Sequence, residues 1–202
     1  MKKIGGVILL VFLISGFSTP KPKVLIIGDS ISIGYFPFIK EEFSEVAILT
    51  HNPRNARYTG HGLNKIREWL GTEKWDIIQF NWGLWDLAYR RPTTENPMAL
   101  DKENGKITST TDEYGRNLDS LVHILKGTGA KLIFVTTTFV PKKEPGRYTD
   151  DVEKYNKIAE KIMKANGVIV NDIYARSKKI HNKYGLGDNN VHYTKEGYRH
   201  LA

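Results

Sequence analysis

The stretch "KVLIIGDSISIG", residues 23–34, decides the fold class of this chain. Residues 23–27 have the length and the branched apolar content of a strand that is covered on both faces. The apolar run stops at Gly28, Asp29 and Ser30, which supply a glycine, a carboxylate and a hydroxyl. Such a strand end is either an ordinary turn into a helix or the presentation of a nucleophile, and the rest of the sequence has to separate these two interpretations.

Four further apolar runs have strand length, and segments of helical period lie between them. The runs are residues 45–49, 75–80, 131–138 and 167–172, and the helical segments are 59–71, 110–129 and 149–167. None of the runs alternates strictly between apolar and polar residues, so both faces of each strand are expected to be covered. Strand-helix alternation of this kind predicts an α/β fold of three layers, α/β/α, around a central, mostly parallel five-stranded sheet. In the second helical segment, Thr111 or Asp112 is the expected N-cap.

The first residues predict an export signal. Lys2 and Lys3 precede an apolar run over residues 7–14, which is short for a membrane span and has the length of a signal-peptide core. We therefore assign residues 1–19 to a signal peptide and residues 20–202 to a single domain, and expect a periplasmic or extracellular protein. The alternative is an uncleaved segment that anchors the chain in a membrane. The chain ends at "EGYRHLA", within its last expected helix, so a truncated C-terminal helix is expected.

Composition limits the partners. The 202 residues carry a formal net charge of +8 and no cysteine. Basic residues are scattered singly or in pairs such as Lys142-Lys143, so an acidic polymer or the cell envelope fits this surface better than nucleic acid does. No cofactor or metal is expected, because "GDSISIG" lacks phosphate-loop spacing and no acidic or histidine cluster has the spacing of metal ligands.

Candidate chemistry lies after the strands, because ligands bind at the carboxyl ends of the strands in an open parallel sheet. Ser30 needs a base to act as a nucleophile, and His192 lies in a polar turn before an expected helix that Thr194 or the preceding asparagines can cap. A tetrahedral oxyanion needs hydrogen-bond donors, for which the N–H groups of Ser30 and Gly60 and the side chain of Asn81 are candidates. Taken alone, Gly60 is better explained as a helix-start glycine, and His192 is better explained as a surface residue of a capping turn.

These residues give the chain a resemblance to the SGNH (GDSL-type) hydrolases. The resemblance is carried by "GDS" after the first strand, "NARYTGHG" after the second, "GLWD" after the third and "NNVHYTKEGY" near the end. It spans nearly the whole chain after residue 19. It implies a flavodoxin-like fold and ester hydrolysis through Ser30 and His192, with an oxyanion site from Ser30, Gly60 and an asparagine.

The sequence departs from the family pattern at two positions. Trp85 stands where the family usually has an asparagine donor, and Asn81 is the candidate replacement. Asn189 stands where the family has the aspartate that orients the histidine, and Asp188 is the adjacent carboxylate. Three outcomes follow: Asp188 takes over the role, a backbone carbonyl orients His192, or the protein hydrolyses esters poorly. We expect the first.

The predicted rim of the site is aromatic and basic. Its candidate substrate-binding residues are Trp82, Trp85, Tyr89 and Arg90. Aromatic faces stack on sugar rings and arginines pair with carboxylates, so one hypothesis is an acetylated polysaccharide, either neutral or acidic. The alternative is that the tryptophans belong to the core and the basic residues form a solvated surface.

The sequence leaves three functions open. The favoured one is a secreted serine esterase that removes acetyl or other short acyl groups from a carbohydrate. The alternatives are a lipid esterase or thioesterase, and a glycan-binding relative that has lost its activity through Trp85 and Asn189. Residues 86–110 and 141–149 are polar and long for connections, which is typical of lids and binding loops.

Overall fold

A computed structural model describes residues 20–202 of the chain, and the predicted signal peptide lies outside the described residues. One five-stranded sheet has the order β2-β1-β3-β6-β7, and each neighbouring pair is parallel. Its strands are β1 (Lys23–Ile27), β2 (Ile48–His51), β3 (Ile77–Phe80), β6 (Lys131–Val135) and β7 (Ile169–Asn171). The predicted α/β fold with a parallel five-stranded sheet is confirmed.

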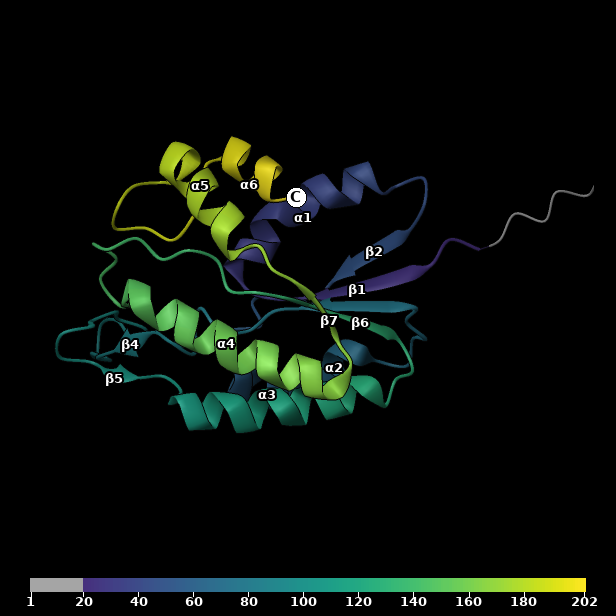
Figure 1. Ribbon diagram of the computed structural model, residues 1–202, viewed down its shortest axis with the longest axis horizontal. Coiled ribbons are helices and arrows are strands. Elements are labelled where there is room, and N and C mark those ends of the chain that lie inside the picture. Colours follow the sequence, from purple (N-terminus) through teal and green to yellow (C-terminus); the bar gives the residue numbers. More distant parts are fainter. Residues whose placement is uncertain (1–19) are drawn as a thin grey trace, which may run out of the picture.

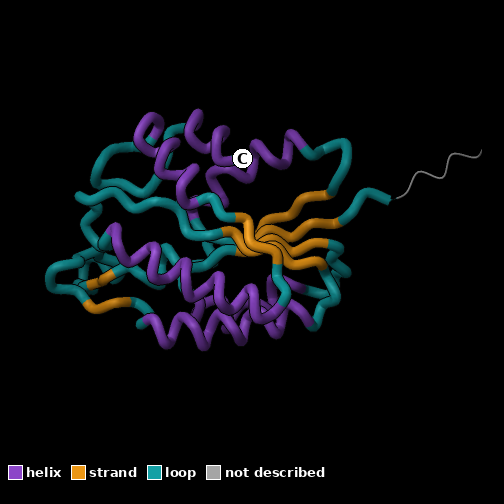
Figure 2. The backbone as a smooth tube through the Cα atoms, viewed as in Figure 1, coloured by secondary structure: helices purple, strands orange, loops and turns teal. Residues whose placement is uncertain are grey.

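Helices cover both faces of this sheet, which makes the three layers seen in Figure 1. Three helices lie on one face, namely α1 (Ser30–Glu42), α5 (Tyr174–Tyr184) and α6 (Lys195–Leu201). The other face carries α2 (Thr59–Leu70), α3 (Thr111–Lys126) and α4 (Thr149–Asn166). Figure 2 shows the strands enclosed between the two groups of helices, which explains why the strand sequences do not alternate. No helix within residues 20–202 is long and apolar enough to cross a membrane.

The core lies on both faces of the sheet, and its part under α2, α3 and α4 includes many fully buried side chains. The apolar stripe that helical spacing predicts for α3, Leu118, Leu121, Val122 and Leu125, has no exposed surface. Phe80 and Phe134, on the neighbouring strands β3 and β6, pack edge to face with ring centroids 5.6 Å apart. Burial of side chains of this size contributes roughly 1.5–3 kcal/mol each, so this stripe sets where α3 lies.

Two boundaries differ from the sequence prediction. Strand β2 starts at Ile48, because residues 43–47 form the turn that ends α1, in which Ala47 N–H donates to Phe43 O. Helix α3 is capped by Thr110 and not by Thr111 or Asp112. Thr110 Oγ1 accepts from the Glu113 N–H at 3.2 Å while the Glu113 carboxylate accepts from the Thr110 N–H at 2.8 Å. This reciprocal capping box satisfies two helix-end donors at once.

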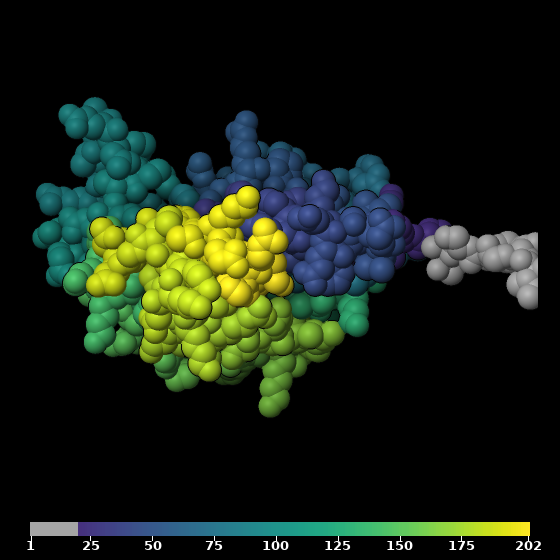
Figure 3. Space-filling model, turned by 90° about the horizontal axis from the view of Figure 1, so that it is seen from above, coloured from purple at the N-terminus to yellow at the C-terminus, as the bar shows by residue number. Residues whose placement is uncertain are grey.

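The long segment after β3 contains structure that the sequence did not reveal. Strands β4 (Tyr89–Arg90) and β5 (Lys106–Ile107) form a small antiparallel sheet within residues 86–110. In the space-filling view of Figure 3 this segment, coloured teal, stands out from the body of the molecule. Its base is attached to the 141–149 loop, since Tyr89 N–H donates to Gly146 O and Lys102 N–H to Pro145 O.

Replacing Thr110 by alanine tests the capping box. We expect Thr110→Ala to lower the free energy of unfolding by about 1 kcal/mol, because the Glu113 N–H loses its acceptor. Thr94→Ala, at an exposed position of the 86–110 segment, is the control and should change it by less than about 0.5 kcal/mol. Urea denaturation of both variants measures the difference, and equal stabilities would refute the cap's contribution.

Candidate active site

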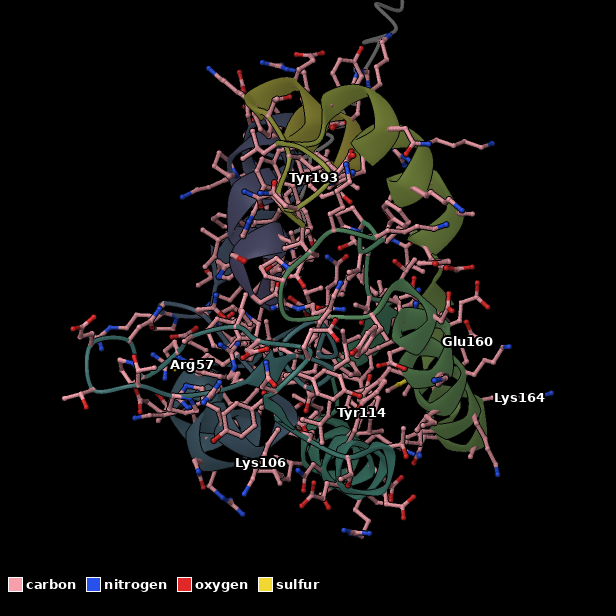
Figure 4. All side chains as sticks on the ribbon, turned by 90° about the vertical axis from the view of Figure 1, so that its left-hand side faces the viewer. Arg57, Lys106, Tyr114, Glu160, Lys164 and Tyr193 are labelled. Carbon is pink, nitrogen blue, oxygen red and sulfur yellow. The ribbon has the colours of Figure 1, made fainter. Side chains whose placement is uncertain are left out.

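The candidate site lies at the edge of the sheet where the strands end. Figure 4 looks onto this edge, with Arg57 from the segment after β2 on one side and Tyr193 from the segment before α6 on the other. Segments that follow all five strands meet here, as expected for a parallel sheet.

Ser30 is held by the turn between β1 and α1. Asp29 is the N-cap of α1, and its carboxylate accepts from the Ile31 N–H at 2.9 Å. Gly28 is fixed by two contacts with the neighbouring segment, donating to Asn52 Oδ1 at 2.9 Å and accepting from the Ala56 N–H at 2.9 Å. A Cβ on Gly28 would lie 2.5 Å from Ser32 Oγ, so only glycine permits this turn. As a result Ser30, the first residue of α1, is half-buried and faces the edge of the sheet.

His192 reaches Ser30 from the other end of the chain. Its Nε2 lies 2.9 Å from Ser30 Oγ, although the two residues are 162 positions apart. The loop that carries His192 is closed by Leu186 N–H donating to His192 O and by the bridge between Gly185 and Tyr193. Helix α6 then starts with Thr194 as its N-cap, accepting from the Gly197 N–H at 3.2 Å. The structure therefore brings together the two residues on which the predicted chemistry depends.

Asn190 is the residue that orients His192. Its Oδ1 lies 2.8 Å from His192 Nδ1 and accepts from the His192 backbone N–H at 3.0 Å. The backbone N–H can only donate, so the oxygen of the amide must face it, and His192 Nδ1 must then carry the proton. In the neutral ring this leaves the lone pair on Nε2, directed at Ser30 Oγ, as a general base requires. A neutral amide therefore selects the productive tautomer.

Asp188 does not take the expected role. Its carboxylate is exposed and pairs with Lys143 Nζ at 3.2 Å, while Asn190 occupies the position beside His192. The adjacent Asn189 is exposed as well. The turn places the side chain two residues before the histidine next to the ring, because an Asx-type turn returns a side-chain oxygen to the N–H two residues on. Our expectation of Asp188 as the orienting group is corrected accordingly.

A buried ion pair lies close enough to His192 to affect its pKa. Arg147 and Glu144 are 5% and 2% exposed and form a salt bridge, and Arg147 Nε donates to Leu84 O at 2.6 Å. The pKa of His192 is lowered, first by burial of the ring and then by the positive charge of Arg147, which Glu144 opposes. Without an adjacent carboxylate nothing at Nδ1 raises that pKa. His192 is therefore a neutral base at neutral pH.

Of the three expected oxyanion donors, the structure supports the Ser30 N–H, and the other two stay predictions. The N–H of Ser30 is the first of α1 and has no intrahelical acceptor, so it is available. The Asn81 Nδ2 donates to Val135 O at 2.7 Å, which ties β3 to β6 and uses one of its two amide protons, so its assignment as an oxyanion donor stays a prediction. Gly60 is the second residue of α2, and a Cβ on it would meet the Tyr58 ring. Its assignment as a donor stays a prediction.

The predicted substrate-binding residues divide into core and rim. Trp82 is 1% exposed in the core, against our expectation, because the glycine at position 62 lets α2 approach its indole. Trp85 is half-buried, and the Arg90 and Arg57 guanidinium carbons lie 4.6 and 5.8 Å from its ring centroid. Tyr89 packs edge to face on Tyr148. The rim therefore presents Trp85 together with arginines.

Asp86, the last residue of "GLWD", is a structural anchor. It is fully buried and accepts from the Thr59 N–H at 3.0 Å, from Thr59 Oγ1 at 2.5 Å and from Ser109 Oγ at 2.8 Å. Burial raises its pKa to about 6, against the opposing effect of these hydrogen bonds. It fixes the start of α2 beside the 86–110 segment.

A second serine–histidine pair lies close by. Ser32 Oγ is 2.8 Å from His51 Nε2, but Ser32 is only 3% exposed and its hydroxyl also lies 2.8 Å from Asp29 O. A substrate cannot reach it, so Ser30 is the hydroxyl available for chemistry.

Among the described residues no group of three or more His, Cys, Asp or Glu side chains is arranged to hold a metal ion.

Sequence reasoning missed Asn190 and Arg147. Asn190 belongs to the "NNVHY" motif, and its signal was an amide two residues before the histidine, which is the spacing of an Asx turn. Arg147 belongs to the 141–149 loop that length alone marked as functional. Nothing local in the sequence distinguished it from the exposed basic residues around it.

Comparison with known proteins identifies the family of the chain. Residues 26–200 match the GDSL-like Lipase/Acylhydrolase family, so the chain belongs to that family of serine ester hydrolases. No curated protein matches the sequence significantly.

Solved structures share the fold. A lipase/acylhydrolase from Enterococcus faecalis has a TM-score of 0.70 at 19% identity, covering 89% of this chain and 91% of its own. An acetyl xylan esterase has a TM-score of 0.70 at 16% identity, over 89% and 95% of the two chains. An acetylxylan esterase from Geobacillus stearothermophilus has 0.67 at 18%, over 90% of each. At these identities the likeness shows the fold alone.

The orienting role of Asn190 is tested by substitution. We expect Asn190→Ala to lower kcat on a nitrophenyl ester by about 10- to 100-fold, because the ring loses the acceptor that sets its tautomer and angle. Asp188→Asn is the matched control, since its carboxylate faces Lys143, and it should stay within about twofold of wild type. A larger loss in the Asp188 variant than in the Asn190 variant would contradict the assignment.

The pH profile follows from the His192 environment. Only the neutral ring acts as a base, and its pKa is lowered, so the acid limb of kcat/KM should have an apparent pKa below the ordinary 6.5 of histidine. Asn190→Asp places a carboxylate beside Nδ1, favours the imidazolium and should move that limb to higher pH. Kinetics from pH 4 to 9 measure the acid limb of the wild type and that of the Asn190→Asp variant. An acid limb above pH 7 in the wild type would contradict the proposed neutral base.

Proposed function

We propose that this protein is an exported serine esterase that removes acetyl or other short acyl groups from a carbohydrate. The 2.9 Å contact between Ser30 Oγ and His192 Nε2, in a ring whose tautomer Asn190 selects, carries the proposal. Membership of a family of ester hydrolases supports it. Two of the structural neighbours described above are acetyl xylan esterases, which favours a small acyl group and a sugar as the leaving alcohol.

The reaction runs in two stages. Ser30 Oγ attacks the ester carbonyl while His192 Nε2 takes the hydroxyl proton, and the Ser30 N–H donates to the developing oxyanion. Collapse of the tetrahedral intermediate breaks the bond to the sugar oxygen, which leaves with the proton from His192. Water then attacks the acyl-serine, His192 takes its proton, and the acid is released as Ser30 regains its hydrogen.

The imidazolium formed in each stage has no carboxylate beside it. In a serine triad, replacing the aspartate by asparagine costs about 10⁴ in turnover, and the principal reason is that the histidine adopts the wrong tautomer. Here the His192 backbone N–H holds the Asn190 amide in the orientation that avoids that outcome. The remaining cost is the missing charge. We therefore propose an active enzyme of modest turnover.

Covalent labelling tests the nucleophile. We expect a fluorophosphonate probe to label the wild type and not Ser30→Ala, because the other serine near the site, Ser32, is buried. Ser32→Ala is the matched control and should keep the label. Labelling that survives Ser30→Ala would refute the nucleophile, and an unlabelled wild type that still binds acetylated glycans would favour the inactive glycan-binding alternative.

The acyl group and the destination of the protein are tested separately. Acetate released faster than octanoate from matched nitrophenyl esters is expected, and the opposite order would favour a lipid esterase.

The export proposal rests on the basic and apolar residues at the start of the sequence. Mass spectrometry of the protein recovered outside the cytoplasm should find a chain that lacks about the first 19 residues.

A further inference from the structure

A hollow of about 530 Å³ lies in the segment that touches the nucleophile turn. Its side chains that matter here are Arg54, Arg57, His61, Lys65, Glu68 and Trp69, and we call it the cationic hollow. Ala56, between the two arginines, donates its N–H to Gly28 O, two residues before Ser30. Arg54 lies two residues before Ala56 and Arg57 one residue after it. Since consecutive Cα atoms are about 3.8 Å apart, the backbone of both arginines lies close to the residue that bonds to the nucleophile turn.

The charge of the hollow is not balanced by the protein. Its one acid, Glu68, pairs with Lys65 at 2.8 Å. Within residues 20–202 no carboxylate lies within salt-bridge distance of Arg54 or Arg57. Two guanidinium groups therefore remain available to an anion, and guanidinium pairs with a planar carboxylate through two parallel hydrogen bonds.

The backbone at both arginines is strained. Arg54 has φ 62° and Arg57 has φ 54°, and they are the non-glycine residues with positive φ in the described part of the chain. Glycine adopts this conformation at lower cost, and Asn55 Oδ1 has to hold the turn by accepting from the Arg57 N–H at 2.7 Å. Strain of this kind, kept next to a nucleophile, indicates that the side chains have a use.

The surroundings of the arginines suit a sugar. The Arg57 guanidinium carbon lies 5.8 Å from the Trp85 ring centroid, which restrains the side chain at the rim of the site. His61 has a lowered pKa because of partial burial and the charges of Arg57 and Lys65, so at neutral pH its ring offers a donor and an acceptor to hydroxyl groups. The volume is within the range of sites that hold small ligands.

We propose that the cationic hollow is a subsite for an acidic sugar, which binds the carboxylate of a uronic-acid unit next to the acylated sugar. The inference deepens the proposed function by naming the substrate as an acidic glycan. The ester then lies at Ser30 while Arg54 and Arg57 hold the neighbouring carboxylate. The binding itself does not depend on ester hydrolysis, so the two can be tested apart.

Binding is measured by titration calorimetry on full-length Ser30→Ala protein. An oligogalacturonate is expected to bind at least about 10-fold more tightly than a xylo-oligosaccharide of equal length, with a preference that weakens as salt increases. Adding Arg54→Asn and Arg57→Asn should abolish the preference. Asparagine is chosen because it tolerates left-handed backbone, and equal melting temperatures would show that the fold is kept.

The control variant is Lys131→Gln, which removes one positive charge at the amino end of β6, the end of the sheet opposite the site. It should keep the preference. Equal affinity for the acidic and the neutral oligosaccharide, or a preference that survives the double arginine substitution, overturns the proposal. Tighter binding of a glycerol-phosphate oligomer than of oligogalacturonate overturns it as well, because the anion would then be a phosphate.

Kinetics on acetylated substrates complete the test. The ratio of kcat/KM for acetylated oligogalacturonate to that for acetylated xylo-oligosaccharide should fall about 10- to 100-fold in the double arginine variant, the loss typical of charged hydrogen bonds. An unchanged ratio overturns the subsite while leaving the esterase intact. If the wild type hydrolyses neither these substrates nor nitrophenyl acetate, the proposed function fails, and calorimetry still decides the hollow.

Discussion

The hydrogen bond between Ser30 Oγ and His192 Nε2 is the interaction on which the rest of the site depends, and the fold makes it through helix packing. Ser30 begins α1, and His192 lies three residues before the start of α6, so the packing of these two helices sets their separation. At that contact Gly34 lies so close to the Tyr198 ring that a Cβ would be 2.3 Å from it. A larger residue at position 34 would force α6 outward and carry His192 with it.

The electrostatics around His192 differ from those of a serine triad with an acid. Asn190 supplies an acceptor without a charge, while the positive charge of Arg147 lowers the pKa of the ring. Both keep the imidazole neutral, so His192 can act as a base down to a lower pH. The same features give less stabilisation to the imidazolium that forms during the reaction. The features that keep His192 neutral before the reaction therefore also make its protonated form less stable during the reaction.

The two departures from the family pattern have different structural consequences. At the orienting position, an amide is recruited from one residue further along the chain, and the productive tautomer is retained. At Trp85 an aromatic ring replaces an amide donor and brings the guanidinium groups of Arg57 and Arg90 to the rim. This part of the site thus carries a cationic surface where the family pattern has a neutral donor.

The sequence by itself determined the α/β fold, the parallel five-stranded sheet and the pairing of Ser30 with His192 as candidates, because strand-helix alternation and the residues after each strand are local signals. Tertiary structure decided which atoms meet. Asn190 rather than Asp188 faces the histidine because of a turn geometry that is set by the loop's closure, and Asn81 donates to Val135 O across neighbouring strands. Trp82 is buried and Trp85 is only half-buried, although they are three positions apart, because α2 packs on the first and leaves the second at the rim. Composition and spacing are the same whichever way these side chains point, so only packing against distant segments could decide which contacts they make.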